Sequence, residues 1–153
     1  MKISSLLILL ISASLLSAQK AELKYILSPD SARANVYQVD AELINTGTQD
    51  LYILVESCNN LDYMLSTTHD SVTIYIPFHC NTSYPKKIKI EAQAAYNFRS
   101  YIKANSGEEA FQLQLELYPL PADIVARDFR LNDLKKKLDP NQKLIMGPEV
   151  SLP

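Results

Sequence analysis

Residues 111–117 read Phe-Gln-Leu-Gln-Leu-Glu-Leu, and this alternation of apolar and polar side chains decides the fold class. Successive side chains of a β-strand point to opposite faces, so such a segment buries one face and exposes the other to water. The same pattern recurs in five further segments, residues 23–27, 37–43, 51–55, 72–78 and 88–94. The sequence therefore predicts an all-β domain in which each strand contributes one apolar face to the core.

Turn-forming residues separate these segments. Asn45-Thr46-Gly47 and Asn105-Ser106-Gly107 are the strongest hairpin candidates, because Asn and Gly tolerate positive φ. Two weaker alternating stretches, residues 61–67 and 97–103, are candidates for edge strands. About seven short antiparallel strands at this spacing are typical of a sandwich of two sheets. The predicted sandwich spans residues 19–121.

The last part of the chain, residues 122–153, follows another pattern. Leucines spaced by three and four residues predict a short amphipathic helix over residues 128–138. Pro140 ends this helix, since the residue before a proline avoids the helical conformation. Residues 143–146 are expected to form a last strand or an extended arm. We expect the helix and tail to pack on the same domain, and an arm that docks on a partner is the alternative.

The N-terminus has the layout of a secretory signal peptide. Lys2 precedes the apolar run Leu6–Leu16, which fits the roughly 7–15 residues of a signal core and falls short of the about 20 that cross a membrane. Cleavage after Ala18 makes residues 1–18 the signal peptide, and an uncleaved anchor is the alternative. We therefore expect a protein exported to the periplasm or the cell exterior, with no stable membrane span after cleavage.

The composition argues against a nucleic-acid-binding protein and for a single domain. Losing Lys2 with the signal leaves 14 of the 15 basic residues against 17 acidic ones, a net charge of −3. Nucleic-acid binders carry a basic footprint, so we expect no nucleic-acid partner. The remaining length suits one domain.

Two cysteines, Cys58 and Cys80, are the candidates for a disulfide, because an exported protein meets oxidising conditions. Buried free thiols and a reactive thiol are the alternatives. His69 and His79 are the only histidines, and they lack the ligand spacing of a zinc site. The sequence therefore predicts neither a metal nor a cofactor.

Motifs for catalysis are missing from the sequence. There is no G-x-S-x-G, and three glycines leave no phosphate-binding loop. Glu108-Glu109 resembles a pair of catalytic carboxylates, but adjacent residues after a turn are more typical of a solvated hairpin rim. We predict no catalytic residues and no enzymatic activity.

The tyrosines are the candidates for a binding surface. The chain has nine tyrosines and no tryptophan, and exposed tyrosine serves both apolar and polar partners. Tyr52 and Tyr75 fall on the polar side of their strands, whereas Tyr63, Tyr96 and Tyr101 lie near turns or in weak strands. The alternative is that these residues are present because tyrosine favours β-strands.

Residues 43–53, Leu-Ile-Asn-Thr-Gly-Thr-Gln-Asp-Leu-Tyr-Ile, resemble exported bacterial Ig-like domains of the hydin type. In that family a strand ends in Asn-Thr-Gly, and the next strand begins with Leu-x-Ile after about three residues. Ser57-Cys58 is similar to a Ser-Cys pair of one branch, which continues with Gly-Cys where this chain has Asn59-Asn60. The resemblance implies an Ig-like sandwich that acts as a binding or scaffold module.

The sequence thus favours an exported, non-catalytic binding or adaptor module. A protein is the expected partner, and a glycan is the alternative. Two other functions remain open: a small envelope hydrolase or carbohydrate-active enzyme, and a structural subunit of a surface assembly that uses strand addition.

Overall fold

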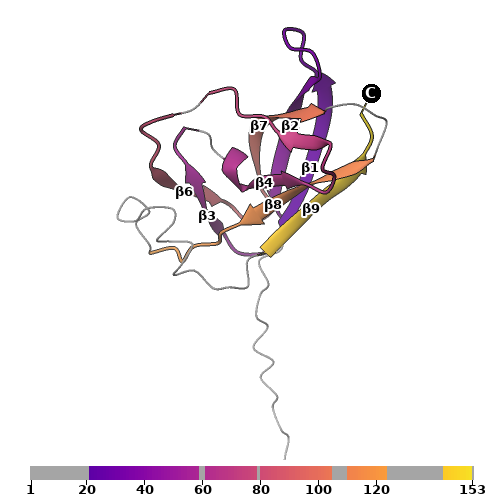
Figure 1. Ribbon diagram of the computed structural model, residues 1–153. Helices are drawn as coiled ribbons and strands as arrows, with labels where there is room; N and C mark the ends of the chain where they lie inside the picture. Colours follow the sequence, from indigo (N-terminus) through magenta and orange to yellow (C-terminus); the bar gives the residue numbers. More distant parts are fainter. Residues whose placement is uncertain (1–20, 59–60, 79, 105–109, 124–142, 153) are drawn as a thin grey trace, which may run out of the picture.

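The computed structural model describes residues 21–58, 61–78, 80–104, 110–123 and 143–152. Within these residues the chain is nearly all β, with one 3₁₀ turn, η1 (Asp62–Met64). The predicted all-β class and antiparallel sandwich are confirmed (Figure 1). The predicted helix over residues 128–138 lies outside the described residues. No helix in the described part of the chain is long and apolar enough to cross a membrane.

Layer one is a four-stranded antiparallel sheet with the order β1-β2-β7-β5. Its strands are β1 (Ala21–Pro29), β2 (Val36–Asn45), β7 (Ala95–Ala104) and β5 (Val72–Ile74). Continuous pairing of β1 with β2 and of β2 with β7 fixes which side chains share a face. The long strands β1, β2 and β7 therefore present a regular surface on each side of the layer.

Layer two combines two smaller sheets, β3-β6 and β4-β8-β9. Its strands are β3 (Leu51–Glu56), β6 (Pro85–Ile90), β4 (Leu65–Thr67), β8 (Phe111–Leu117) and β9 (Lys143–Val150). The segment after β8 joins the two sheets, because the Leu54 N–H donates to Tyr118 O (3.2 Å) and the Leu120 N–H donates to Tyr52 O (2.7 Å). Both β3 and β4 therefore lie along the same side of the chain that runs from β8 to Leu120.

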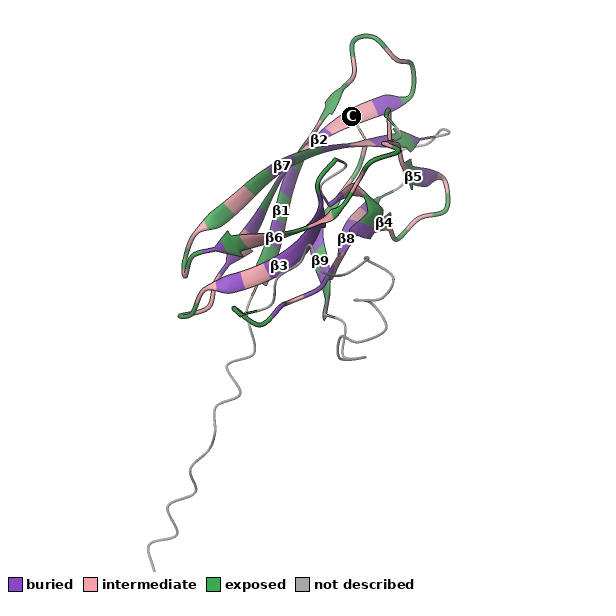
Figure 2. Cartoon of the chain, turned by 90° about the vertical axis from the view of Figure 1, so that its left-hand side faces the viewer, coloured by how far each residue is buried: buried purple, intermediate pink, exposed green. Residues whose placement is uncertain are grey.

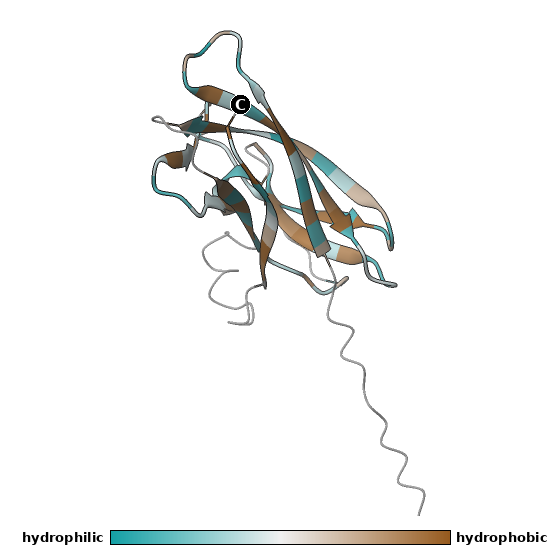
Figure 3. Ribbon diagram, turned by 90° about the vertical axis from the view of Figure 1, so that its right-hand side faces the viewer, coloured by the Kyte–Doolittle hydropathy of each residue, from teal (hydrophilic) through white to brown (hydrophobic). Residues whose placement is uncertain are grey.

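The core fills the space between the two layers (Figure 2). Along β8 the residues alternate between buried and half-buried, and Leu113 and Leu115 have no exposed surface. Figure 3 shows the same alternation as apolar and polar bands along the strands. Removing such a side chain from water stabilises the fold by about 2 kcal/mol, so the alternation read from the sequence is the main source of stability.

Tyr25 links β1 to layer two through hydrogen bonds of its hydroxyl group. Its hydroxyl donates to Pro148 O (2.6 Å) and accepts from the Leu113 N–H (3.1 Å). Gly147 lies against the ring, where an added Cβ would come within 2.4 Å of Tyr25 Cε1. Glycine at this position therefore allows β9 to approach β1.

Two turn and strand predictions are wrong. Asn45–Gly47 does not close a hairpin, because β2 and β3 belong to different layers. The strand predicted over 72–78 ends at Ile74, and one further backbone bond, from the Tyr75 N–H to Tyr101 O, follows it. The second predicted hairpin, Asn105–Gly107, lies outside the described residues.

Three predicted strands also differ from expectation, two in their bounds and one in its place in the sheet. Residues 61–67 form η1 and then the three-residue β4. The strand predicted over 88–94 ends at Ile90, because Gln93 adopts a positive φ of 62° in the turn to β7. Residues 97–103 form part of the interior strand β7 instead of an edge strand, since β2 and β5 flank it on both sides. Small residues such as Ser100 and Ala104 on its buried face weaken the apolar signal.

Asp62 places a carboxyl group at the margin of the core. Burial raises the pKa of this carboxyl, and the nearby Ser100 hydroxyl opposes part of the shift. Because the folded state then binds the proton more tightly than the unfolded state, stability falls as the pH rises from about 4 through the raised pKa. We expect Asp62→Asn to flatten this part of the profile of unfolding free energy against pH, measured by urea unfolding between pH 4 and 8. If the variant has the same profile as the wild type, groups other than Asp62 cause the pH dependence.

Candidate binding face

The side chains of layer one that point away from layer two form a surface that we call the outer face. The strand register arranges them in rows across β1, β2 and β7. These rows are Lys24–Glu42–Asn97, Ile26–Asp40–Arg99 and Ser28–Gln38–Tyr101. The outer face is therefore mostly polar, with Ile26 as a large apolar side chain that is 70% exposed.

Asp40 is the centre of a hydrogen-bonded group on this face. Arg99 Nε donates to Asp40 Oδ1 (2.9 Å), and Gln38 Nε2 donates to Asp40 Oδ2 (2.7 Å). The hydrogen bond from Arg99, followed by that from Gln38, holds the pKa of the Asp40 carboxyl below its usual range. Water screens this exposed pair, so it contributes little to stability. Its effect is to hold three polar side chains in a defined arrangement.

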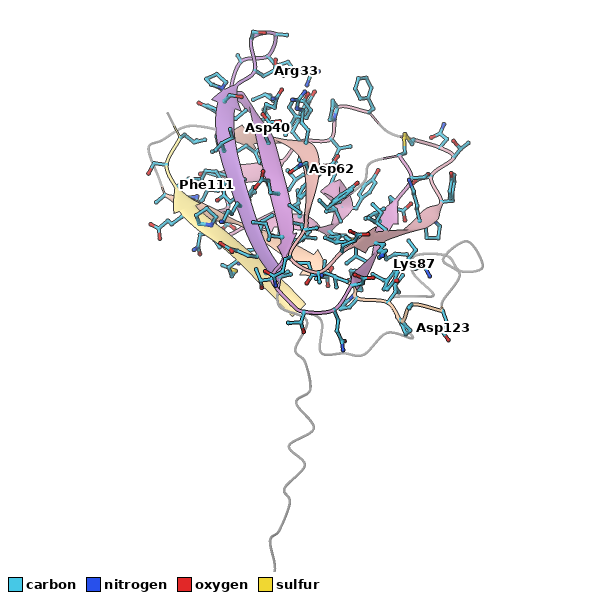
Figure 4. All side chains as sticks on the ribbon, turned by 180° about the vertical axis from the view of Figure 1, so that it is seen from behind. Arg33, Asp40, Asp62, Lys87, Phe111 and Asp123 are labelled. Carbon is cyan, nitrogen blue, oxygen red and sulfur yellow. A yellow bond between two sulfur atoms is a disulfide. The ribbon has the colours of Figure 1, made fainter. Side chains whose placement is uncertain are left out.

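Arg33 lies between two tyrosines at one end of the outer face. Its guanidinium carbon is 5.4 Å from the centre of the Tyr75 ring and 5.5 Å from that of Tyr101, which is the range of cation–π contacts. Asp30 Oδ2 lies 3.7 Å from Arg33 Nη1. The Tyr75 N–H donates to Tyr101 O (2.8 Å), so backbone pairing sets the spacing of the two rings. Figure 4 shows Arg33 at the β1–β2 loop, to which it belongs, and Asp40 further along the same pair of strands.

A shallow groove of about 1050 Å³ crosses the outer face and includes Asp40 and Arg99 in its lining. It is lined by Glu22–Ile26 of β1, Asp40–Glu42 of β2, Asn97–Arg99 of β7 and Met146–Pro148 of β9. The groove thus brings the charged rows of layer one together with the exposed side chains of Ile26 and Met146. An extended ligand could contact polar and apolar groups along this path.

The five tyrosines predicted for a binding surface lie in different surroundings. Tyr75 and Tyr101 come together around Arg33. Tyr52 is half-buried on layer two below the Lys87 ammonium group, which is 5.3 Å from the ring centre. Tyr63 is 46% exposed in η1. Tyr96 stacks on Phe98 and packs against the core. Their role in binding stays a prediction.

Cys58 and Cys80 form a disulfide, with their Cα atoms 6.2 Å apart. His69 Nδ1 lies 2.7 Å from Ser71 Oγ within a turn. His79 and Glu108-Glu109 lie outside the described residues. Among the residues that are described, no three His, Cys, Asp or Glu side chains gather as metal ligands would.

Sequence reasoning missed Arg33, Asp40 and Arg99 as members of the candidate site. The alternation along 37–43 assigns Asp40 to a polar face, but it does not reveal that Arg99 lies opposite. Arg33 comes from a turn that has no periodic pattern. Only the pairing of β2 with β7 and the course of the β1–β2 loop bring these side chains to one surface.

No protein-family model matches the sequence, and no curated protein matches it. The resemblance to Ig-like domains of the hydin type therefore stays a prediction, and the function is inferred from the structure alone.

Proposed function

We propose that this protein is an exported, non-catalytic binding module that contacts a partner protein through the outer face of layer one. The observation that carries the proposal is the groove on this face, with the Asp40–Arg99 pair in its lining and the Arg33 group at one end of the same face. Tyrosine and arginine dominate the energetics of protein interfaces. Side chains already held in one arrangement lose less entropy when a partner binds.

The lining of the groove favours binding over hydrolysis. Within the described residues it contains no serine, cysteine or histidine, the usual nucleophiles and bases of hydrolases. Two of its three carboxylates, Glu22 and Asp40, form ion pairs with Lys24 and Arg99. Such paired groups are better suited to complementary contacts than to proton transfer.

A protein partner fits this face better than a glycan does. Arg33 lies over the rings of both Tyr75 and Tyr101, so these rings offer no pair of open faces on which a sugar could stack. The guanidinium and the carboxylates are groups that ion-pair with side chains of another protein.

The strand order supports the finer part of the proposal, an Ig-like arrangement. In Ig-like sandwiches one sheet has the order A-B-E-D, and in the other F lies between C and G. Layer one has the order β1-β2-β7-β5, and β8 lies between β4 and β9. The disulfide is compatible with an oxidising destination outside the cytoplasm.

The proposal is tested by crosslinking in the native cell. A photoreactive amino acid replaces Asn97 in the groove of the full-length, tagged protein, and copurifying adducts are identified by mass spectrometry. We expect one protein adduct in stoichiometric amount. Replacement of Ser66, an exposed residue on β4 of layer two, is the matched control and should give at least tenfold less of this adduct. A clean monomer without adducts at Asn97 would contradict a binding role for the outer face.

A further inference from the structure

The free edge of β1 has a backbone pattern that the register reveals. The Asp30 N–H donates to Val36 O (2.9 Å), and Asp30 directly follows the last residue of β1. Bonded and non-bonded pairs alternate along an antiparallel ladder. Every second residue back from Asp30 therefore bonds to β2. It follows that Leu23, Tyr25 and Leu27 direct their N–H and C=O groups away from β2, toward the open edge of layer one.

Strand β9 lies beside this edge without pairing to it (Figures 1 and 4). Within the described residues the two strands form no ladder, because β1 and β9 belong to different sheets. Their polar link is the bond from the Tyr25 hydroxyl to Pro148 O. The edge groups of Leu23, Tyr25 and Leu27 thus face no strand with which they form a ladder.

The groove of the outer face reaches this edge. Leu23 and Tyr25 line the groove although they are only 1% and 7% exposed. Each of them therefore offers the groove little more than the edge of its backbone. Ile26 of β1 and Met146 of β9 flank the same region and are 70% and 42% exposed. An unpaired edge strand is a template on which another chain can add a strand, and the exposed apolar side chains of Ile26 and Met146 lie next to this edge.

We propose that an extended segment of a partner protein adds to layer one as a strand along β1. Strand addition supplies affinity through main-chain bonds and specificity through alternate side chains. This inference rests on the proposed function and names the way in which the partner is bound. The added segment would place an apolar side chain beside Ile26 and a basic one near Glu22.

The charges of the groove favour this chemistry. Its lining has three carboxylates, of Glu22, Asp40 and Glu42, against the two cations of Lys24 and Arg99. Both cations already form ion pairs with Glu22 and Asp40. Glu42 has no ion pair within the described part of the chain, so a basic side chain on the partner would meet an excess of negative charge.

A second copy of this chain would pair with the free edge of β1 less favourably than a segment of another protein. If β1 paired with itself antiparallel about Tyr25, Lys24 would lie opposite Ile26 of the other copy. The register that matches Glu22 with Lys24 overlaps only residues 21–25 and leaves Ile26 outside. A partner segment is not bound by this symmetry and can match both Ile26 and Glu22.

The test uses the full-length protein in its native cell with a photoreactive amino acid at Ile26. The crosslinked segment is mapped by mass spectrometry, and amide hydrogen exchange is measured on the purified, non-crosslinked complex. We expect the amides of Leu23, Tyr25 and Leu27 to exchange at least tenfold more slowly in the complex. The mapped segment should alternate apolar and polar residues and contain a basic one.

Proline substitution separates edge pairing from other contacts. Leu27→Pro removes an edge N–H without removing a bond to β2, and it should lower complex formation at least tenfold. Ile74→Pro is the matched control at the opposite edge. Ile74 is also half-buried against the core, and its N–H also points outward because Thr73 and Tyr75 face β7. If Leu27→Pro does not fold, Ile26→Lys on the water-exposed side replaces it.

The outcomes distinguish this inference from the proposed function. Unchanged exchange of the three amides, with capture from Asn97 intact, would overturn strand addition and leave the binding module standing. Adducts from Ile26 only to a second copy of the chain would also overturn it. Failure of capture from both Asn97 and Ile26 would overturn both proposals.

Discussion

Replacing Asn45 with alanine is expected to lower the free energy of unfolding by about 3 kcal/mol. Asn45 is 1% exposed, at the end of β2. Its Nδ2 group donates to Gln49 O (2.8 Å), Ile90 O (3.1 Å) and Glu91 O (3.1 Å). Its Oδ1 accepts from the Gly47 N–H (3.0 Å). One side chain therefore joins the turn between the two layers to the turn between β6 and β7.

The size of this effect follows from what alanine would leave behind. Each hydrogen bond contributes about 1 kcal/mol net, and a buried carbonyl without a donor costs more than an exposed one. Alanine removes every side-chain bond at once and leaves the Ile90 carbonyl without its side-chain donor in a buried setting. The two turns would then be joined by the exposed bonds of Gln93 and by the bond from the Ala92 N–H to Asp50 Oδ1, apart from packing and ion pairs.

Urea unfolding monitored by circular dichroism measures the effect, with the slope m compared to ensure that both proteins unfold alike. Gln93→Ala is the matched control, because Gln93 Nε2 joins the same turns by donating to Thr46 O (3.0 Å) and Gly47 O (2.7 Å) from an exposed position. It should cost under about 1 kcal/mol. Equal losses in the two variants would show that burial of Asn45 is not what matters.

Asn45 also illustrates how much of the fold could be predicted from sequence. Its identity as a turn residue was readable, since Asn-Thr-Gly interrupts an alternating pattern. Its contacts were not, because Ile90 and Glu91 are more than 40 positions away along the chain. A turn signal marks where a strand ends, but it does not determine whether the next strand pairs in the same sheet or crosses to the other layer.

The strands differ in the same way. Alternation predicted β2 and β8 well, because one face of each packs on the core and the other meets water or polar neighbours. It overextended the strand from Val72, where only three residues pair with β7. Periodicity records which side chains prefer burial, whereas the length of a strand depends on a partner that the local sequence does not specify.

The candidate site was the least predictable part. Residue type alone predicts Tyr75 and Tyr101 as binding residues, but their relation to each other depends on the pairing that continues past β5. Arg33 contacts them from a loop, and Arg99 of β7 donates to Asp40 on the neighbouring strand β2. The free edge of β1 is likewise a property of topology, because β9 runs beside β1 but pairs with β8 in another sheet.

The double variant Cys58→Ser/Cys80→Ser is expected to lose about 3 kcal/mol of unfolding free energy, the chain-entropy value for a closed loop of this length. The two residues are 22 positions apart. The loop that they close contains η1, β4 and β5, and it therefore contributes to both layers. Without the crosslink the unfolded chain gains conformations, so the folded state is less favoured.

The native fold should nevertheless survive in this variant, because other bonds hold the ends of the loop together. The Ser57 N–H donates to Tyr84 O (2.9 Å), and the Tyr84 N–H donates to Ser57 Oγ (3.1 Å). Ser83 Oγ donates to the buried Glu56 carboxylate (2.5 Å). These contacts extend the pairing of β3 with β6 toward the disulfide.

Urea unfolding with and without reductant tests the prediction, and the double variant is its own control for effects of reductant on the rest of the chain. Wild-type protein should lose stability on reduction until it matches the variant, whereas the variant should not respond. A wild-type protein that ignores reductant while the variant unfolds early would mean that the serines disturb local packing and that the crosslink contributes nothing. Equal stability of all four samples would mean that the β3–β6 pairing alone fixes this end of the sandwich. The loop that contains β4 and β5 would then be held by its sheet contacts and not by the disulfide.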